Sequence, residues 1–277
     1  MVRITKTSLA ATLCLFGAAF SAQPALSAAA RLPFSSSFET GSFSEWNGGL
    51  DASMTVTSSV ASSGRYSTQA VMTPGRSTDN YKEYVFGDNR RVNGEAADDG
   101  VWLSFDSRFD TGFRFGDGAT VHKIAILNLE DVNDGRRRYQ IILNVWTANN
   151  AYFIEHLKWN ADGSFNRAMP TVSQNIGTEA KVRFGQWDKL KLYIKPNTLG
   201  QANGVVRLWV NGELKAEHTN VSLRESVPVN PNKLIMSNYV TQTTTSGTQR
   251  WDNWHLSETD PDAGTVRPNP PVLNSVQ

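Results

Sequence analysis

Two alternating stretches within residues 185–220 constrain the fold more than any other part of the chain. Each stretch places apolar residues at every second position, with mostly polar residues between them. A period of two predicts antiparallel strands that cover a core with one face. After the second stretch, Asn211-Gly212 supplies the two positive-φ residues that a tight type I′ hairpin requires. The two apolar faces consist of Leu190, Leu192 and Ile194, and of Val206, Leu208 and Val210.

The composition predicts one all-β domain. Val, Ile, Thr and aromatic residues are abundant, and no long stretch shows the 3.6-residue period of a helix. The chain has 27 basic and 26 acidic residues, so no global field favours nucleic acid. Outside the N-terminal leader, no apolar stretch has the length that a bilayer span requires. We therefore expect a monomer with neither a nucleic-acid partner nor a membrane partner.

The N-terminus has the pattern of a secretory signal peptide. Arg3 and Lys6 precede an apolar run from Leu9 to Phe20, and small residues follow up to Ala30. We expect residues 1–30 to be cleaved and the product to be secreted or periplasmic. The only cysteine in the sequence, Cys14, lies within this leader, so no disulfide or thiolate metal site is expected in the mature chain.

The remaining sequence divides into a domain and a tail. Residues 31–259 contain all the strand-like stretches. Residues 260–277 are rich in Pro, Asp and Asn and too poor in apolar residues to pack a core. We predict one domain at 31–259 and a disordered tail at 260–277.

Three further strands predict a groove lined by aromatic and polar side chains. Aromatic rings offer flat apolar faces for sugars, while amides and charges bind hydroxyls and carboxylates. Ordinary cross-strand pairs on an exposed sheet account equally well for any one of these residues. The side chains expected on the groove face are Gln140, Ile142, Asn144 and Trp146 in one strand, Tyr152, Ile154, His156 and Lys158 in the next, and Trp102, Ser104, Asp106 and Arg108 in a third.

Several motifs resemble one carbohydrate-active family. The pattern over residues 187–212, a Trp and a strand followed by Asn-Thr-x-Gly-Gln-x-Asn-Gly and Trp-Val-Asn-Gly, is similar to that of the concanavalin A-like jelly rolls of polysaccharide lyases, especially lyase family 14. His122–Leu127 keeps the lysine of the family's Lys-Leu-Pro-Gly-Leu motif without its proline and glycine. Tyr152–Ile154 keeps the first residue of a Tyr-x-Tyr pair and replaces the second. The resemblance covers most of Ser37–Glu258 and implies a β-jelly-roll sandwich of two antiparallel sheets.

The resemblance also implies β-elimination on an acidic, uronate-containing polysaccharide, with no cofactor required for the chemistry. The reaction needs a group that neutralises the carboxylate, a base for the C5 proton and an acid for the leaving O4. A tyrosine can be the base if a nearby cation lowers its pKa, whereas a histidine titrates near neutral pH. The catalytic candidates are Lys123, Tyr152, His156, Gln140 and Asn144, and the substrate-binding candidates are Trp102, Arg108, Trp146, Lys158 and Tyr239. Tyr152 and His156 are the candidate bases, and Tyr152 and Tyr239 are the candidate acids.

Other functions remain open at this stage. A non-catalytic carbohydrate-binding protein with the same fold is the main alternative, and a structural or adhesive surface protein is a third. A paired-carboxylate glycosidase is disfavoured, because no strand carries two or three acids at period-two spacing. We expect His122 to be buried rather than catalytic. The run Arg136–Arg138 is either a charged turn or the rim of an acidic-glycan groove.

A structural calcium ion is a further expectation. Glu39, near the start of the domain, and Asp252, near its end, resemble residues that join the terminal strands of carbohydrate-active jelly rolls around a hard cation. Oxygen ligands of this kind suit calcium. An equal alternative makes Glu39 a turn residue and Asp252 a cap of the last strand.

Overall fold

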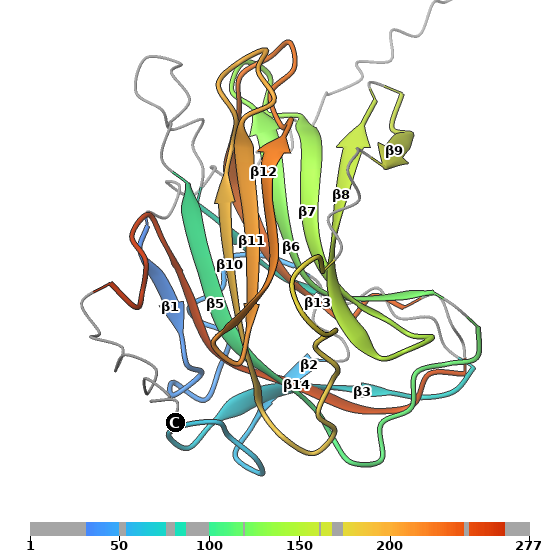
Figure 1. Cartoon of the computed structure of the whole chain (residues 1–277). Helices are drawn as coiled ribbons and strands as arrows, with labels where there is room; N and C mark the ends of the chain where they lie inside the picture. The colour runs from blue at the N-terminus through green and yellow to red at the C-terminus, as the bar shows by residue number, and fades with distance from the viewer. Residues whose placement is uncertain are drawn as a thin grey trace, which may run out of the picture.

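A computed structural model describes residues 32–49, 54–75, 81–86, 100–118, 120–160, 162–167, 174–240 and 244–263. Within these ranges the regular structure is entirely β, with fourteen strands in two antiparallel sheets (Figure 1). The predicted leader and residues 264–277 of the predicted tail lie outside the described ranges. No helix of the described part has the length and apolar character needed to cross a bilayer.

The larger sheet, sheet A, contains the stretch on which the fold prediction depends. Its strand order is β12-β11-β10-β5-β14-β3-β2, and β1 pairs with β14 beside this path. The strands are β1 (Phe34–Ser36), β2 (Met54–Thr57), β3 (Ser67–Met72), β5 (Val101–Phe109), β10 (Asp188–Lys195), β11 (Gly204–Val210), β12 (Glu213–Val221) and β14 (Gly247–Ser257).

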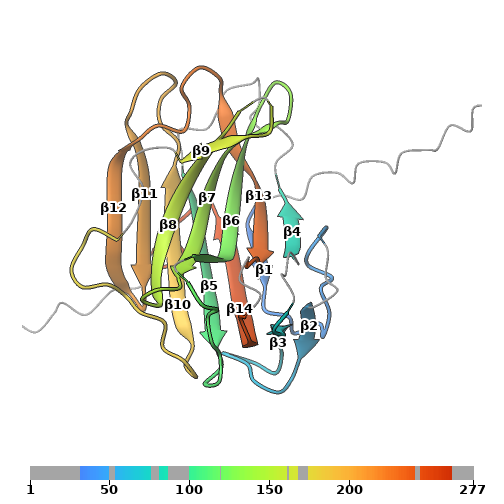
Figure 2. The same cartoon turned by 90° about the vertical axis from the view of Figure 1, so that its right-hand side faces the viewer.

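The smaller sheet, sheet B, lies in front of sheet A in Figure 2. Its strand order is β4-β13-β6-β7-β8-β9. The strands are β4 (Tyr81–Val85), β6 (Val121–Asp131), β7 (Arg137–Trp146), β8 (Ala151–Trp159), β9 (Phe165–Arg167) and β13 (Val229–Ser237). Two antiparallel sheets packed face to face confirm the predicted jelly-roll sandwich.

The alternating stretches form the predicted strands β10 and β11. Leu190 pairs with Val210 and Leu192 with Leu208, and the apolar set of both strands is buried. The predicted hairpin is present as well, since Asn211 and Gly212 have φ angles of 54° and 85° and connect β11 to β12. Two residues with positive φ match a type I′ turn, whose twist suits the flanking strands.

The core between the sheets is aromatic. Phe105 of β5 stacks on Trp254 of β14 with ring centroids 4.0 Å apart, and Trp46 meets Trp254 edge-on. At one side, Phe34 of β1 stacks on Tyr84 of β4, which joins sheet A to sheet B. Such large side chains bury much apolar area, and burial of apolar area is the main favourable term in folding.

A buried carboxylate links the two sheets at another point. Asp188, the first residue of β10, accepts hydrogen bonds from the Tyr152 hydroxyl of β8 at 2.8 Å and from Asn211 Nδ2 at 2.9 Å. Arg183 forms an ion pair with the same carboxylate at 2.5 Å. Because every one of these partners donates a hydrogen bond, the buried negative charge of Asp188 is compensated inside the fold.

A β-bulge in β6 decides which side chains of this strand face outward. Leu127 and Leu129 face the core, so strict alternation would also turn Lys123 inward. The β6–β7 register shifts between Lys123 and Ala125. The extra residue, Ile124, is buried in the core, and Lys123 faces outward beside Asn144 of β7. His122 is fully buried, as predicted.

Candidate active site

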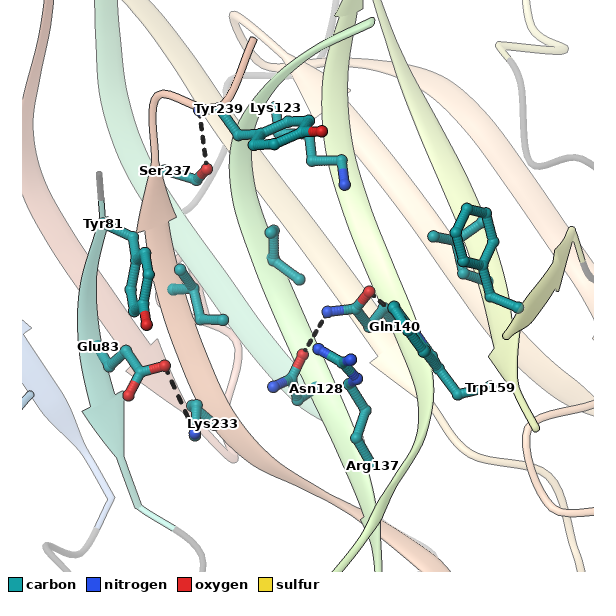
Figure 3. A pocket seen from close by; sticks show the side chains of 14 residues that line it. Tyr81, Glu83, Lys123, Asn128, Arg137, Gln140, Trp159, Lys233, Ser237 and Tyr239 are labelled. Atoms are coloured by element: carbon teal, nitrogen blue, oxygen red, sulfur yellow. Dashed lines mark hydrogen bonds and ion pairs between the residues drawn. The ribbon is translucent and has the colours of Figure 1, made fainter. Parts of the chain in front are cut away.

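The outer face of sheet B contains a pocket with a volume of about 440 Å³ (Figure 3). Six strands contribute to it, so residues distant in the sequence meet there. The lining residues are Tyr81 and Glu83 of β4; Lys123, Ile126 and Asn128 of β6; Arg137 and Gln140 of β7; Leu157 and Trp159 of β8; Phe165 of β9; Lys233, Ile235 and Ser237 of β13; and Tyr239 just after β13.

The floor of the pocket is apolar. Ile126, Ile142, Leu157 and Ile235 form a small cluster separate from the main core, and Tyr81 packs against it. The three isoleucines point away from sheet A, because their neighbours along the strand belong to the main core. Leu157 follows the buried His156 and points the same way. A packed floor fixes the side chains above it in position.

One wall is a hydrogen-bonded chain of three side chains. Trp159 Nε1 donates to Gln140 Oε1 at 2.9 Å, and Gln140 Nε2 donates to Asn128 Oδ1 at 2.8 Å. The Arg137 guanidinium lies 3.6 Å from the centre of the Trp159 ring. Partial burial lowers the pKa of Arg137 and the nearby Glu130 opposes that effect, but an arginine remains cationic at all ordinary pH values. The wall thus presents an ordered indole, two amides and a cation.

The opposite end of the pocket holds Lys123 and Tyr239. The backbone N–H of Lys123 donates to the Tyr239 carbonyl at 3.0 Å, which ties the end of β13 to β6. Lys123 Nζ lies 4.6 Å from the centre of the Tyr239 ring, and Figure 3 shows the two side chains next to each other. The Tyr239 N–H also donates to Ser237 Oγ at 3.1 Å. The pair is therefore held in place through backbone contacts as well as side chains.

The charges of the lining residues favour an anionic ligand. Among the described lining residues there are three cations, Lys123, Arg137 and Lys233, and a single carboxylate, Glu83. Glu83 is already engaged by Lys233, with a distance of 3.4 Å between Nζ and Oε1. A concave surface with an excess of one sign of charge attracts ligands of the opposite sign.

The structure brings three of the predicted site residues together. Lys123, Gln140 and Tyr239 all line the pocket. Asn144 and Trp146 lie on the predicted outer face of β7 but outside the lining, and Asn144 is buried next to Lys123. Trp146 packs against Phe153, with 6.0 Å between ring centres.

The predicted face of β8 is wrong. Tyr152 pairs with Val145 and His156 with Ile141, and both side chains are buried between the sheets. Tyr152 is bound to Asp188, and burial raises its pKa well above the ordinary value of 10.0. Burial lowers the pKa of His156 to about 4. Neither residue reaches the pocket, so neither is placed to act on a ligand there.

Lys158 belongs to the same misassigned face. It pairs across the sheet with Tyr139 and forms an ion pair with Glu225 at the edge of the sandwich. The error has a physical cause, because both faces of β8 are covered by apolar side chains. One face meets the core and the other forms the pocket floor, so the period of two does not identify the inner face.

The predicted role of β5 is also wrong. The strand does alternate as the sequence indicates, since Val101, Leu103, Phe105 and Phe109 are buried. However, β5 belongs to sheet A, so Trp102 and Arg108 point to the outer face of the other sheet. Arg108 forms an ion pair with Asp110 at 3.0 Å. Trp102 therefore cannot share a groove with Lys123.

Glu39 and Asp252 hold a loop through backbone amides. Glu39 accepts from the N–H groups of Arg65 and Tyr66, and Asp252 accepts from those of Ser62 and Ser63. Burial raises the pKa of Asp252 to about 6, and the charge of Asp106 adds to the effect. Within the described ranges, no group of three or more His, Cys, Asp or Glu residues is arranged to hold a metal ion. The calcium ion therefore stays a prediction.

Several pocket residues carried no sequence signal. Tyr81, Glu83 and Lys233 come from β4 and β13, which are neighbours only in the folded chain. Trp159 and Asn128 were not predicted, because the sequence does not show which residues of β8 and β6 face outward. One signal was present, since Arg137 lies in the arginine run that was considered as a groove rim, and Arg138 of the same run pairs with Asp131 and Asp134 instead.

Comparisons with known proteins identify a family for this chain. The sequence profile of a family described as "Polysaccharide lyase" matches residues 38–233. No curated protein sequence matches the chain. Among solved structures, an endo-β-1,4-glucuronan lyase from the fungus Trichoderma reesei is similar with a TM-score of 0.54 and 15% identity, covering 79% of this chain and 93% of that one.

Two alginate lyases are similar to the same extent. A mutant of alginate lyase Aly36B in complex with an alginate tetrasaccharide has a TM-score of 0.53 and 12% identity, covering 77% of this chain and 85% of that one. A marine lyase of family 14 from Aplysia kurodai has a TM-score of 0.51 and 12% identity, covering 74% of this chain and 86% of that one. At such low identity these likenesses show the fold.

Replacing Tyr152 with Phe tests its structural role. We expect Tyr152→Phe to lower the free energy of unfolding by about 1–3 kcal/mol, because the buried Asp188 carboxylate loses one donor. Urea denaturation of the variant and the parent measures the difference. Tyr66→Phe, at a partly exposed tyrosine, is the matched control. An unchanged unfolding midpoint combined with a large loss of turnover would contradict the structural role and indicate a catalytic role for Tyr152.

The buried His156 makes stability depend on pH. Its pKa is about 4 in the folded protein and near its ordinary value of 6.5 in the unfolded chain. Between these values only the unfolded chain binds the proton, so His156 supports stability above pH 6.5 and that support is lost as the pH falls toward 4. We expect the free energy of unfolding of His156→Leu to fall less between pH 6.5 and 4 than that of the parent. Urea denaturation at several pH values measures the difference.

The comparison isolates His156 from the other titrating groups. His122 has a similarly lowered pKa and the raised pKa of Asp252 acts in the opposite direction, but both are present in parent and variant. His218→Leu, at a partly exposed histidine, is the control. Parallel pH profiles for parent and His156→Leu would contradict the buried neutral state.

Proposed function

Because the chain belongs to the polysaccharide lyase family, we propose that it cleaves an acidic, uronate-containing polysaccharide by β-elimination in the pocket of sheet B. One observation carries the proposal: among the described residues that line the open cavity there are three cations and one carboxylate, and that carboxylate is paired with Lys233. A uronate chain offers one carboxylate per residue to such a surface. Solved relatives of the same fold include lyases named for glucuronan and alginate, both of which are polyuronates.

The arrangement fits elimination better than hydrolysis. A glycosidase needs two carboxylic groups, one on each side of the glycosidic bond, separated by roughly 5–9.5 Å. Among the described lining residues Glu83 stands alone as a carboxylate. Elimination instead needs positive charge at the uronate carboxylate and one group that moves a proton.

We assign the carboxylate to the cationic side of the pocket. Arg137 offers a planar set of donors suited to a carboxylate, and the Gln140–Asn128 pair offers amide groups beside it. Trp159, held by Gln140 and Arg137, presents a fixed ring face on which a sugar can stack. Hydrogen bonds and positive charge at the carboxylate stabilise the enolate that forms when C5 loses its proton.

Lys123 and Tyr239 are the residues placed to carry the chemistry. We assign charge stabilisation of the enolate to the Lys123 ammonium and proton transfer to the Tyr239 hydroxyl. In its deprotonated form the hydroxyl takes the C5 proton, the C5–H electron pair then forms the C4–C5 double bond, and the C4–O4 bond breaks. The same hydroxyl returns the proton to the leaving O4, so the reaction balances without a co-reactant.

The proposed function also fits the predicted export. Polyuronates are polymers outside the cell, too large to cross a membrane, so an enzyme that acts on them works after secretion. We therefore keep export of the mature chain as part of the proposal.

Loss of the Lys123 charge tests the proposed function. We expect Lys123→Ala to lower kcat about 10²- to 10³-fold on the preferred polyuronate, because one stabilising group for the enolate is removed. The measurement is the ultraviolet absorbance of the unsaturated uronate, which elimination forms and hydrolysis does not. Lys158→Ala, on the other face of the same sheet, is the control. A flat trace for the parent on every polyuronate, with retention on one of them, would indicate a binding protein instead.

Tyr239→Phe separates proton transfer from ring contact. The variant keeps the ring beside Lys123 and removes only the hydroxyl. We expect kcat to fall about 10²- to 10⁴-fold with little change in the affinity for the polymer, as for loss of a general acid or base. Single-turnover rates and equilibrium binding measure the two effects. If the variant had the parental kcat, another group would have to transfer the proton, and Tyr81→Phe would be the next substitution to compare.

A further inference from the structure

A second aromatic surface lies on the outer face of sheet A, on the side of the molecule opposite the pocket. Trp102 of β5, Tyr193 of β10 and Trp209 of β11 are all partly exposed. The ring centres of Trp102 and Tyr193 are 4.4 Å apart, and those of Trp102 and Trp209 are 5.7 Å apart. The rings are tilted by 31° in both pairs, so they form a nearly continuous surface.

The register of three neighbouring strands produces this surface. Tyr193 lies directly opposite Trp102, and Lys191 lies directly opposite Trp209. Gly100 also makes room, because a Cβ at this position would lie 2.5 Å from the Tyr193 ring. Side chains two residues apart share a face, so one row of the sheet holds two rings and the next holds a lysine and a ring.

Lys191 lies at the centre of the surface and already binds carboxylates. Its Nζ lies 5.2 Å from the centre of the Trp102 ring and 4.8 Å from that of Trp209. It forms ion pairs with Asp260 at 3.2 Å and Asp262 at 2.5 Å. These aspartates belong to the segment predicted to be a disordered tail, but residues 260–263 form a hydrogen-bonded turn here.

A hollow with a volume of about 520 Å³ adjoins the rings. Trp209 and Lys191 form part of its lining, together with Lys189 and the amide side chains of Asn211 and Asn253. Asp262 also reaches into it. Asp106 lies in the lining too, where its carboxylate accepts from Ser62 Oγ and Asn253 Nδ2. The flat ring and the two lysines are groups that bind the apolar face and the carboxylate of an acidic sugar.

We propose that this outer face of sheet A is a second binding site for the acidic polysaccharide, and that Asp262 occupies its carboxylate position in the free protein. The identity of the ligand rests on the function proposed above. The Asp262 side chain is 48% exposed, and ion pairs with exposed partners are weak and easily exchanged. A uronate chain supplies many carboxylates at once and can replace Asp260 and Asp262 on Lys191.

The position of the site gives it a role distinct from cleavage. Sheet A and the main core separate it from the pocket, so a chain bound there is not in contact with Lys123 or Tyr239. Two sites on one molecule convert the second binding event into an intramolecular one and raise the overall affinity for long polymers. Short oligosaccharides that fill only one site gain nothing from the other.

Binding in gels that contain a polymer tests the proposal. All proteins carry Lys123→Ala, which slows cleavage, and migrate through native gels with alginate, glucuronan, neutral hydroxyethylcellulose or no polymer. We expect Trp209→Ala to weaken retention by a polyuronate several-fold and Asp262→Asn to strengthen it. Asp117→Asn, at an exposed loop residue, makes the same change of charge elsewhere and is the control for Asp262→Asn.

Two results would overturn the second binding site. Retention unchanged by both Trp209→Ala and Asp262→Asn would overturn the second site, and so would retention by the neutral polymer alone, which would make the surface one for uncharged glycans. Because Asp262→Asn leaves the sheet intact, a folding defect in Trp209→Ala does not remove the test. Absorbance of the parent on the same polyuronates reports the proposed cleavage separately, so either proposal can fail while the other stands.

Discussion

The rest of the structure depends on sheet B carrying packed apolar side chains on both of its faces. Its inner face buries Tyr152, Ile154 and their neighbours against sheet A, and its outer face keeps a small apolar floor beneath charged and hydrogen-bonding side chains. A sheet that only covered a core would leave the outer residues free to vary in position. Here the floor packs them, and packing is what holds a catalytic group within a fraction of an ångström of its working place.

The fold could be predicted from the sequence to a large extent, because the signals that define it are local. Alternation in β10 and β11 and the Asn211-Gly212 turn each depend on adjacent residues, and the family motifs extend the same conclusion over most of the chain. The inner residues of β5 and β7 follow the same rule. Where one face of a strand is apolar and the other is polar, the period of two is sufficient to identify the face that lies in the core.

The site could be predicted only in part, because its determinants are not local. Lys123 faces the pocket owing to a register shift that its own sequence does not reveal, and Tyr152 faces the core because both sides of β8 are apolar. Glu83 and Lys233 meet through a sheet order that skips along the chain. Of the predicted residues, Lys123, Gln140 and Tyr239 line the pocket. Tyr152 does not, although it belongs to a family motif, because it lies on the inner face of β8, and Trp102 and Arg108 lie on the other sheet.

The loop between β2 and β3 is held mainly through its backbone, which makes it a candidate position for protein engineering. Glu39 and Asp252 bind it mainly through the backbone amides of residues 62, 63, 65 and 66, which any side chain leaves available. The hydroxyls of Ser62 and Ser63 add hydrogen bonds to Asp106 and Asn253. Gly64 is constrained as well, since a Cβ there would lie 2.5 Å from a Glu39 oxygen. Apart from that glycine and the two serines, the segment is a suitable position for grafting a foreign peptide onto a rigid sandwich.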